Sequence, residues 1–256
     1  MLETRDLTIR FGGHVAVEHV SCAFAPGTLT AIVGPNGAGK TTYFNLVSGQ
    51  LPASEGRVLL DGEDLSSLPA PLRTRKGLGR AFQLTQLFPR LSVMENVRLA
   101  VQAREEGRHG LGLDLLRVWL DRKAWIDEAR SLLDSVRLLD KADAPAASLP
   151  HGDQRKLEVA LLIALDPKVF MFDEPTAGMS VDEVPVILDL VRALKARRDR
   201  TILLVEHKMD VVRELADRII VLHNGQLVAD GEPATVIASP VVQQAYLGTL
   251  QEEAAA

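Results

Sequence analysis

Eight consecutive residues, 34–41, have the residue types and the spacing needed to hold a chain of phosphates. They fit the pattern G-x-x-x-x-G-K-[ST], between the apolar run Leu29–Val33 and a helix-compatible run over residues 42–48. The glycines let the backbone curl so that successive N–H groups point at phosphate oxygens, and the next helix directs its positive end to the same place. Lys40 adds positive charge for the outer phosphates, and the Thr41 hydroxyl can ligate Mg²⁺. We therefore predict a phosphate-binding loop made by Gly34, Asn36, Gly37, Ala38, Gly39, Lys40, Thr41 and Thr42.

A second group of reactive side chains follows buried strands. Residues 169–172 are continuously apolar and run directly into Asp173 and Glu174. In phosphate-loop proteins, an acid at the carboxyl end of a neighbouring strand holds Mg²⁺. We expect Asp173 in that role and Glu174 as the group that polarises the attacking water. His207 directly follows a strand predicted over residues 201–206, at an end that faces the ligand crevice in sheets of this type.

The elements that must position these groups alternate between strands and helices on both sides of an all-helical stretch. Strands are predicted within residues 4–33, with a hairpin turn at Gly12 and Gly13, and then over residues 57–60, 169–172, 201–206, 218–222 and 226–229. Helical periodicity covers residues 93–139, interrupted by glycines at 107–112, and returns over residues 154–165, 184–197 and 209–216. Residues 141–148 are predicted to be an Ala/Pro linker. The order predicts an α/β core that carries a helical subdomain.

Composition restricts the class of protein. The chain has 256 residues, of which 46% are hydrophobic and 25% charged, so one or two domains with a large core are expected. Its net charge of −5 argues against nucleic acid as the main partner. The single cysteine, Cys22, fits a reducing compartment. Because apolar runs stay well below the roughly 20 residues of a membrane span, we expect a soluble chain whose membrane role, if any, comes through a partner.

Five separated segments resemble, in their usual order, the motifs of the ATPase subunits of ABC transporters. Besides the phosphate loop and the Asp173–Glu174 pair, Gln83 resembles the Q-loop glutamine, residues 149–155 a variant signature motif, and residues 177–180 the D-loop at the dimer seam. The resemblance covers nearly the whole chain. It implies a P-loop NTPase (RecA-like) α/β core with an antiparallel β subdomain and an inserted helical subdomain. The whole chain, 1–256, would be one such domain, with its core in 1–92 and 156–256 and the helical subdomain in 93–155.

The resemblance also implies roles for single residues. ATP and Mg²⁺ are the implied ligands, and the family's switch histidine, which holds the γ-phosphate, corresponds to His207. Gln83 would sense the γ-phosphate and border the cleft where the transmembrane partner docks. The implied catalytic residues are Glu174, His207, Lys40 and Gln83. The implied Mg²⁺ ligands are Thr41, Gln83 and Asp173. Phe11 would stack on the adenine, and the γ-phosphate of a second subunit would be capped by Pro150, His151, Gly152 and Asp153.

The signature motif departs from the family pattern L-S-G-G-Q, of which only Leu149 and Gly152 remain. Pro150 offers neither a hydroxyl nor an N–H to a phosphate. One interpretation is that this loop closes a nucleotide site more weakly, by roughly 1.5–3 kcal/mol for one lost charge-assisted hydrogen bond. The other is that the backbone donors and the end of a helix beginning near Asp153 suffice. We expect the Asp153 carboxylate to turn away from the phosphate.

Finer features are similar to the ATPases of branched-chain amino acid importers, namely residues 11–13, 82–89, 91–97, 205–207 and 245–248 and the longer loop around residues 107–124. Such a subunit would pair head to tail with a second ATPase, identical or different, on the cytoplasmic face of a bacterial or archaeal inner membrane. The dimer would drive two permease subunits served by an external substrate-binding protein. Importers of urea, short amides or aromatic acids, exporters and lipid transporters remain alternatives. A soluble ABC ATPase of DNA repair or ribosomes is disfavoured, because those usually carry coiled-coil inserts or two fused ATPase domains.

Overall fold

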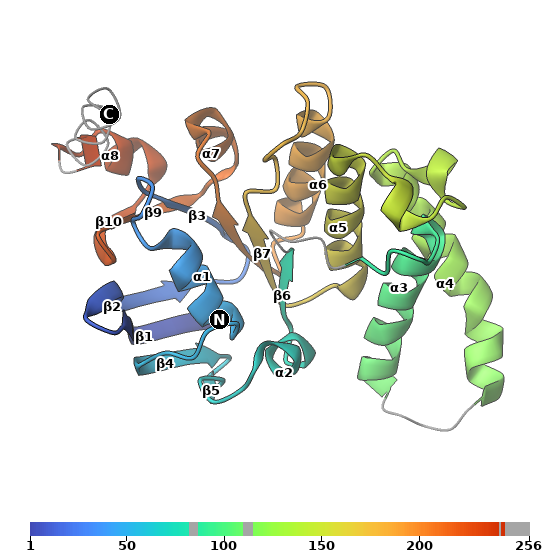
Figure 1. The fold of residues 1–256 in the computed structure, drawn as a ribbon, viewed down its shortest axis with the longest axis horizontal. Coiled ribbons are helices and arrows are strands. Elements are labelled where there is room, and N and C mark those ends of the chain that lie inside the picture. Colours follow the sequence, from blue (N-terminus) through green and yellow to red (C-terminus); the bar gives the residue numbers. More distant parts are fainter. Residues whose placement is uncertain (82–86, 110–114, 241, 244–256) are drawn as a thin grey trace. The chain divides into compact units, whose positions relative to one another are not determined.

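The computed structural model describes residues 1–81, 87–109, 115–240 and 242–243 (Figure 1). Gln83 and the segment 245–248 lie outside these residues. The chain forms two compact units. The first consists of Met1–Leu78, Lys168–Glu174 and Leu194–Ala256, and the second of Gly79–Pro167 and Pro175–Ala193. The second unit thus extends beyond residues 93–155 on both sides, and the division of labour between a core and a helical subdomain stays a prediction.

The first unit begins with an antiparallel sheet in the order β2-β1-β4-β5. β1 (Leu2–Phe11) and β2 (His14–Phe24) form the hairpin that Gly12 and Gly13 indicated, and Gly12 adopts a φ of 58° that suits glycine. β1 pairs on its other side with β4 (Glu55–Leu60), which is followed by the short β5 (Glu63–Asp64).

The second sheet has the strand order β10-β9-β3-β8-β7-β6. β3 (Leu29–Val33), β7 (Val169–Asp173) and β8 (Thr201–Val205) are buried along their whole length, which explains their unbroken apolar sequences. They run parallel to one another and to β9 (Arg218–His223), while β10 (Gln226–Gly231) is antiparallel at one edge and β6 (Leu78–Ala81) lies at the other. The carboxyl ends of β3, β7, β8 and β9 therefore share one edge of the sheet, and this edge positions the candidate site.

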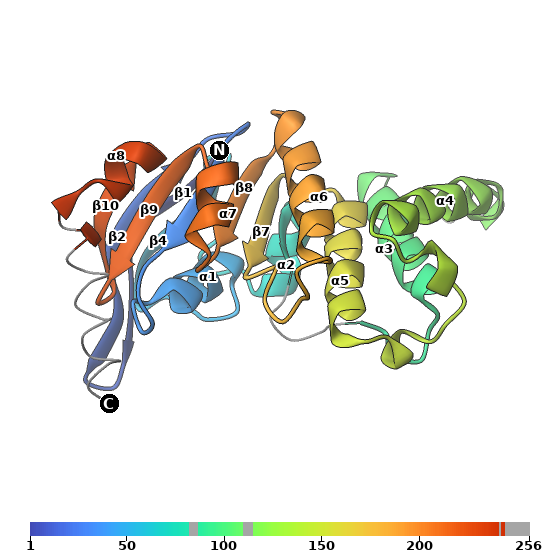
Figure 2. The same ribbon diagram turned by 90° about the horizontal axis from the view of Figure 1, so that it is seen from above.

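Both faces of this sheet are covered, as the alternation of its side chains requires. One face, with Ile32 and Ile220, joins the core formed with the antiparallel sheet and α1 (Lys40–Ser48). The opposite face, with Ala31 and Ile219, packs with residues of α7 (Met209–Leu215) and α8 (Pro233–Ile237) (Figure 2). The remaining helix of this unit is α2 (Ala70–Arg75).

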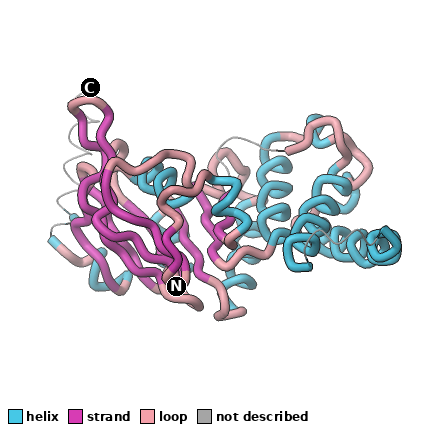
Figure 3. The backbone as a smooth tube through the Cα atoms, turned by 90° about the horizontal axis from the view of Figure 1, so that it is seen from below, coloured by secondary structure: helices cyan, strands magenta, loops and turns pink. Residues whose placement is uncertain are grey.

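The second unit is built mainly of helices, whereas the strands gather in the first (Figure 3). Its helices are α3 (Val93–His109), α4 (Leu115–Ser135) and α5 (His151–Leu165), together with most of α6 (Val184–Ala196). Val97, Trp125, Leu133 and Leu157 belong to a shared apolar cluster. α3 ends at His109 and α4 begins at Leu115, so the region of helical periodicity contains two helices. The break expected over 107–112 lies partly inside α3 and partly outside the described residues.

Two local expectations were wrong. α5 begins at His151 rather than at residue 154, because Pro150 occupies the cap position with an extended backbone and the helix starts immediately after it. The expected linker over 141–148 contains one 3₁₀ turn and the end of another, Ala146–Ser148 and Leu139–Lys141. The short elements β5, α2, β6 and α8 are additional to those expected, since too few residues make a recognisable period.

Candidate active site

The phosphate loop follows β3, and its backbone packs closely against β9 and β2 of the first unit. A Cβ atom at Gly34 would lie 2.1 Å from the carbonyl oxygen of Leu222 in β9. A Cβ atom at Gly39 would lie 2.6 Å from the carbonyl oxygen of Ala16 in β2, and Gly39 has a φ of 95°. Backbone approach this close excludes any side chain. Both glycines of the sequence pattern are therefore required by packing.

The turn after β9 holds the loop in place. The Gly225 N–H donates to the Ala38 carbonyl at 3.1 Å, and the Glu18 N–H donates to the Gly225 carbonyl at 2.9 Å. Asn224 precedes this glycine with a φ of 48°, a conformation that asparagine tolerates. Sequence reasoning predicted the strands on both sides of this turn but missed the place of the turn in the site. That place follows from the pairing of β9 beside β3, which sequence patterns do not reveal.

Lys40 begins α1 and is only 6% exposed. Its Nζ donates to the carbonyl oxygens of Gly34 and Pro35 at 2.7 and 2.8 Å. Burial lowers the pKa of Lys40, and the negative charges of Glu174 and Asp173 oppose that effect. Both carboxylates thus lie near the ammonium group. A buried cation beside a helix start whose cap residue, Gly39, has no side chain offers charge and free N–H groups to an anionic ligand.

The two expected carboxylates follow one another at the end of β7. Asp173 is the last strand residue and is 2% exposed. Glu174 has a φ of 49°, in the left-handed region, which costs a non-glycine residue about 1 kcal/mol or more. Its N–H donates to the Val205 carbonyl of β8 at 2.9 Å. The hydrogen-bond ladder between β7 and β8 therefore continues to Glu174, whose side chain is the one in the site.

His207 meets Glu174, as expected from two neighbouring strand ends. Its Nε2 lies 2.8 Å from Oε1 of Glu174, and because a carboxylate accepts, Nε2 carries the proton. The His207 side chain is 44% exposed and that of Glu174 25%. The pair is accessible to a ligand and to water, which suits groups that act on a bound phosphate.

These groups line one cavity of about 550 Å³ in the first unit. A cavity of this size, with cationic and N–H donors on one wall and a carboxylate–histidine pair on another, can bind a nucleotide and place water against its phosphate. Sequence reasoning missed the β2 residues and the turn in its wall. Among the described residues, the lining consists of His14, Val15, Ala16, Asn36, Gly37, Ala38, Gly39, Lys40, Thr41, Thr42, Glu174, His207, Asn224 and Gly225.

Four of the residues predicted for the nucleotide and its metal do not appear in that lining. Phe11, at the end of β1, is 50% exposed, so its contact with a base stays a prediction. Asp173 is buried as described above, and Gly34 contributes to the loop through its backbone. Gln83 lies outside the described residues, and nothing in the geometry bears on its role.

The comparison with known proteins shows the family of this chain. A family model described as "ABC transporter" matches residues 17–177, which is more than half of the chain. The chain belongs to the ABC transporter family. The resemblance carried by the motifs is thereby confirmed, together with the α/β P-loop fold and the assignment as an ATPase of that family.

Several ABC relatives align over nearly their full length. The high-affinity branched-chain amino acid transport ATP-binding protein LivG of Escherichia coli K12 is 37% identical over 97% of this chain and 98% of its own. The corresponding protein BraF of Pseudomonas aeruginosa is 36% identical over 97% of this chain and 98% of its own. A crystal structure of a nucleotide-free ATP-binding cassette from an ABC transporter matches with a TM-score of 0.79 and 28% identity, over 96% of this chain and 98% of that one.

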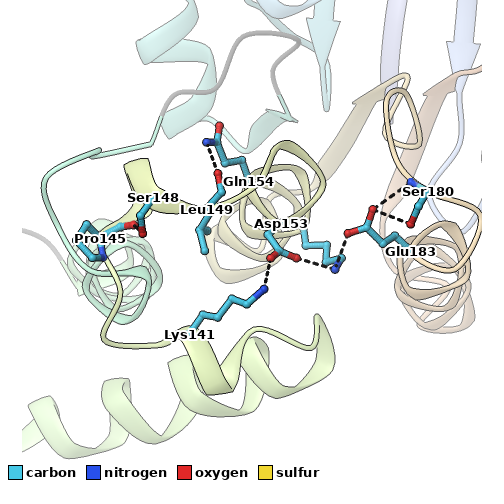
Figure 4. A network of polar contacts seen from close by, with 9 residues as sticks. Lys141, Pro145, Ser148, Leu149, Asp153, Gln154, Ser180 and Glu183 are labelled. Carbon is cyan, nitrogen blue, oxygen red and sulfur yellow. Dashed lines mark hydrogen bonds and ion pairs between the residues drawn. The ribbon is translucent and has the colours of Figure 1, made fainter.

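The variant signature residues of this ABC ATPase belong to the second unit. Pro150 is the cap residue of α5, and His151, Gly152 and Asp153 form its first turn. The Asp153 carboxylate is bound by Lys141 and Lys156 (Figure 4). Burial alone would raise the pKa of Asp153, but these two ammonium groups hold it below its ordinary value. The acid that would repel a phosphate is therefore neutralised by partners of its own.

Proposed function

We propose that this chain is the ATP-binding and ATP-hydrolysing subunit of an ABC importer, with branched-chain amino acids as the substrates. The observation that carries the proposal is similarity to LivG over 97% of the chain, joined to a cavity in which the phosphate loop, Glu174 and His207 meet. The transported molecule would be selected by other subunits. This chain supplies the conformational work through the different affinities of ATP for open and closed dimers.

Each residue of the cavity has its own role in ATP binding or hydrolysis. Lys40 exchanges the carbonyl oxygens of Gly34 and Pro35 for the outer phosphate oxygens of ATP. The N–H groups at the start of α1 donate to the same phosphates. Glu174 orients a water in line with the γ-phosphate. His207, whose Nε2–H already reaches Glu174, donates to a γ-phosphate oxygen when the nucleotide fills the cavity.

The hydroxyl of Thr41 and the carboxylate of Asp173 are hard oxygen donors of the kind that Mg²⁺ prefers. Thr41 lines the cavity, and Asp173 lies near enough to Lys40 to act on its pKa. We assign these two residues, with Gln83, to the metal. When bound, Mg²⁺ neutralises charge on the β- and γ-phosphates.

A Glu174→Gln variant tests the catalytic assignment. Because an amide binds nucleotide as well as a carboxylate but polarises water poorly, we expect ATP affinity within about threefold of wild type and turnover reduced by about 100-fold or more. Calorimetry and phosphate release measure the two. Lys40→Ala is the matched variant that should lose binding itself. Turnover near the wild-type rate in Glu174→Gln would remove Glu174 from this role.

An apolar cavity of about 440 Å³ in the second unit supports permease docking. Phe88 stands at this cavity with 58% of its surface exposed. Asn96 fixes it, since Oδ1 accepts from the Phe88 N–H at 2.8 Å and Nδ2 donates to the Phe88 carbonyl at 3.1 Å. The other apolar lining residues are Ala81, Leu99, Ala100, Ala103, Leu161, Leu162 and Leu165.

Attachment to the membrane follows from that docking. Within the described ranges, the helices fall short of the length and apolar character that a membrane crossing demands. We propose that two ATPase subunits pair head to tail and bind two permeases as peripheral subunits on the cytoplasmic face of the membrane. Co-purification of the chain with two permeases and an amino-acid-binding protein would support this arrangement. Co-purification with an exporter or with permeases that carry urea would contradict the substrate class.

A further inference from the structure

An ion network joins the first turn of α5 to the loop that precedes α6, entirely within the second unit (Figure 4). Lys156 is its centre, because its Nζ lies 2.8 Å from Oδ1 of Asp153 and 3.0 Å from Oε1 of Glu183. Lys141 binds the other oxygen of Asp153. The side chains of Lys156 and Asp153 are 9% and 6% exposed, so their attraction is weakly screened by solvent.

Glu183 extends the ion network into the loop before α6, whose residues 177–180 resemble a D-loop. Its Oε2 accepts from both the N–H and the Oγ of Ser180, each at 3.0 Å. This is the return half of a capping box, in which a glutamate satisfies the N–H three residues before it. Residues 180–183 are therefore held in a fixed turn, and one ammonium group ties that turn to α5.

The two segments also touch through their glycines. A Cβ atom at Gly152 would lie 2.5 Å from Oε2 of Glu183, and a Cβ atom at Gly178 would lie 3.1 Å from the His151 ring. Only glycine at 152 leaves room for the Glu183 carboxylate in this position. Packing and charge thus bring the same two segments together at the start of α5.

We propose that Lys156 is a positioning residue that fixes the loop 177–183 to the first turn of α5, so that both present one preformed surface to the partner ATPase. The inference rests on the proposed head-to-tail dimer. It explains how α5 keeps a defined start although Pro150 has no side-chain acceptor for its N–H groups. The ion pair of Asp153 and Lys156 orders the first turn of α5, as a capping serine would. The positive charges of Lys141 and Lys156 balance the negative charges of Asp153 and Glu183.

The charges of these groups agree with the geometry of the network. The partners Asp153 and Glu183 raise the pKa of Lys156 against the opposing effect of burial. The N–H of Ser180, followed by Lys156, lowers the pKa of Glu183. All the groups of the network are therefore charged at neutral pH, and removing one leaves its partner poorly compensated.

The experiment compares Lys156→Met, Lys156→Arg and Glu183→Gln, each in the Glu174→Gln background, where ATP is bound but not consumed. Calorimetry on dilute protein measures the affinity of the chain's own site for ATP. Analytical ultracentrifugation with ATP and Mg²⁺ measures dimerisation, with the partner ATPase added if the working dimer is mixed. Asp189→Asn is the control, since it breaks an ion pair of α6 whose aspartate is 69% exposed.

We expect Lys156→Met and Glu183→Gln to weaken ATP-dependent dimerisation by about tenfold or more, while ATP affinity changes by less than about twofold. Lys156→Arg should restore most of the loss, and Asp189→Asn should have no effect. Glu183→Gln is isosteric and decides the question if Lys156→Met folds poorly.

Dimerisation like that of the background protein in Glu183→Gln, or equal losses of ATP affinity and dimerisation, would overturn the role of Lys156. If the background protein itself binds ATP but stays monomeric, the head-to-tail dimer fails and the inference fails with it. Failure of the nucleotide site alone would show instead as absent ATP binding in the background protein. These outcomes are distinguishable in the same set of measurements.

Discussion

Glu174 combines a strained backbone conformation with the carboxylate that we propose orients the attacking water. Its left-handed φ of 49° is unfavourable for a side-chain-bearing residue, yet its N–H continues the β7–β8 ladder and its carboxylate meets His207 at 2.8 Å. The sheet therefore holds this carboxylate where a freely folding turn would not. Such preorganisation is what orientation of an attacking water requires.

Gly34 gives the sharpest test of the loop. A Gly34→Ala methyl group would collide with the Leu222 carbonyl at 2.1 Å, so we expect the free energy of unfolding to fall by on the order of 3 kcal/mol and ATP binding to be lost. Gly13→Ala is the matched control, because a Cβ atom there meets nothing within 4 Å. Thermal melting and calorimetry measure the two effects. Wild-type behaviour of Gly34→Ala would contradict the close approach of β9.

Asp153 gives a prediction in pH. Because its folded pKa is lowered from the ordinary 3.8, its charge stabilises the folded state above that pH, and the contribution is lost as pH falls through the folded value. Asp153→Asn should therefore reduce the free energy of unfolding by about 2 kcal/mol near pH 7, with the difference from wild type shrinking below pH 3.8. Urea unfolding across pH measures this. A difference that stays constant with pH would contradict the ion pairing, and Asp189→Asn should show almost none.

At the scale of elements, the start of α5 decides between the two interpretations of the variant signature. A Pro150→Ser substitution supplies a side-chain acceptor at the cap position and should raise the free energy of unfolding by about 1 kcal/mol. If the serine hydroxyl also caps the partner's phosphate, ATP-dependent dimerisation should strengthen as well. Melting temperature and ultracentrifugation separate the two effects. No change in either would favour the view that backbone donors suffice.

The segment around Phe88 offers a test of permease docking. Phe88→Ser removes the exposed ring from the apolar cavity of the second unit, so we expect several-fold weaker co-purification with the permeases. ATP binding and melting temperature should stay near wild type, because the ring is 58% exposed. Leu72→Ser, in α2 of the first unit and 39% exposed, is the matched control. Undiminished co-purification would place the permease contact elsewhere.

Elements with long, regular patterns were predictable from the sequence. The strands Leu29–Val33 and Val169–Asp173 could be identified because buried strands are short apolar runs that stop at polar residues. The chemical roles of those polar residues stay predictions. The walls contributed by His14 and Asn224 were not predictable, since they depend on which strands become neighbours. The Lys156–Glu183 ion pair was likewise not predictable, because its residues are far apart in the sequence. Lys and Glu are common surface residues, and the sequence alone does not indicate that they pair inside the protein.

At the scale of the whole molecule, the cavity belongs to the first unit and the signature turn to the second. Hydrogen exchange of the Glu174→Gln protein should therefore respond to ATP in two ways. Amides of residues 36–42 should gain protection at any protein concentration. Amides of residues 151–154 should gain it only at concentrations that allow a second subunit to bind. Equal protection of both segments in dilute protein would contradict the head-to-tail arrangement.

The hydrogen bonds that join Glu18, Ala38 and Gly225 have a consequence for truncated chains. The phosphate loop depends on a turn at Asn224 and Gly225 and on β9, which pairs directly with β3 although it comes much later in the sequence. A polypeptide that stops before residue 225 lacks that support. We therefore expect such a truncated product to bind ATP poorly.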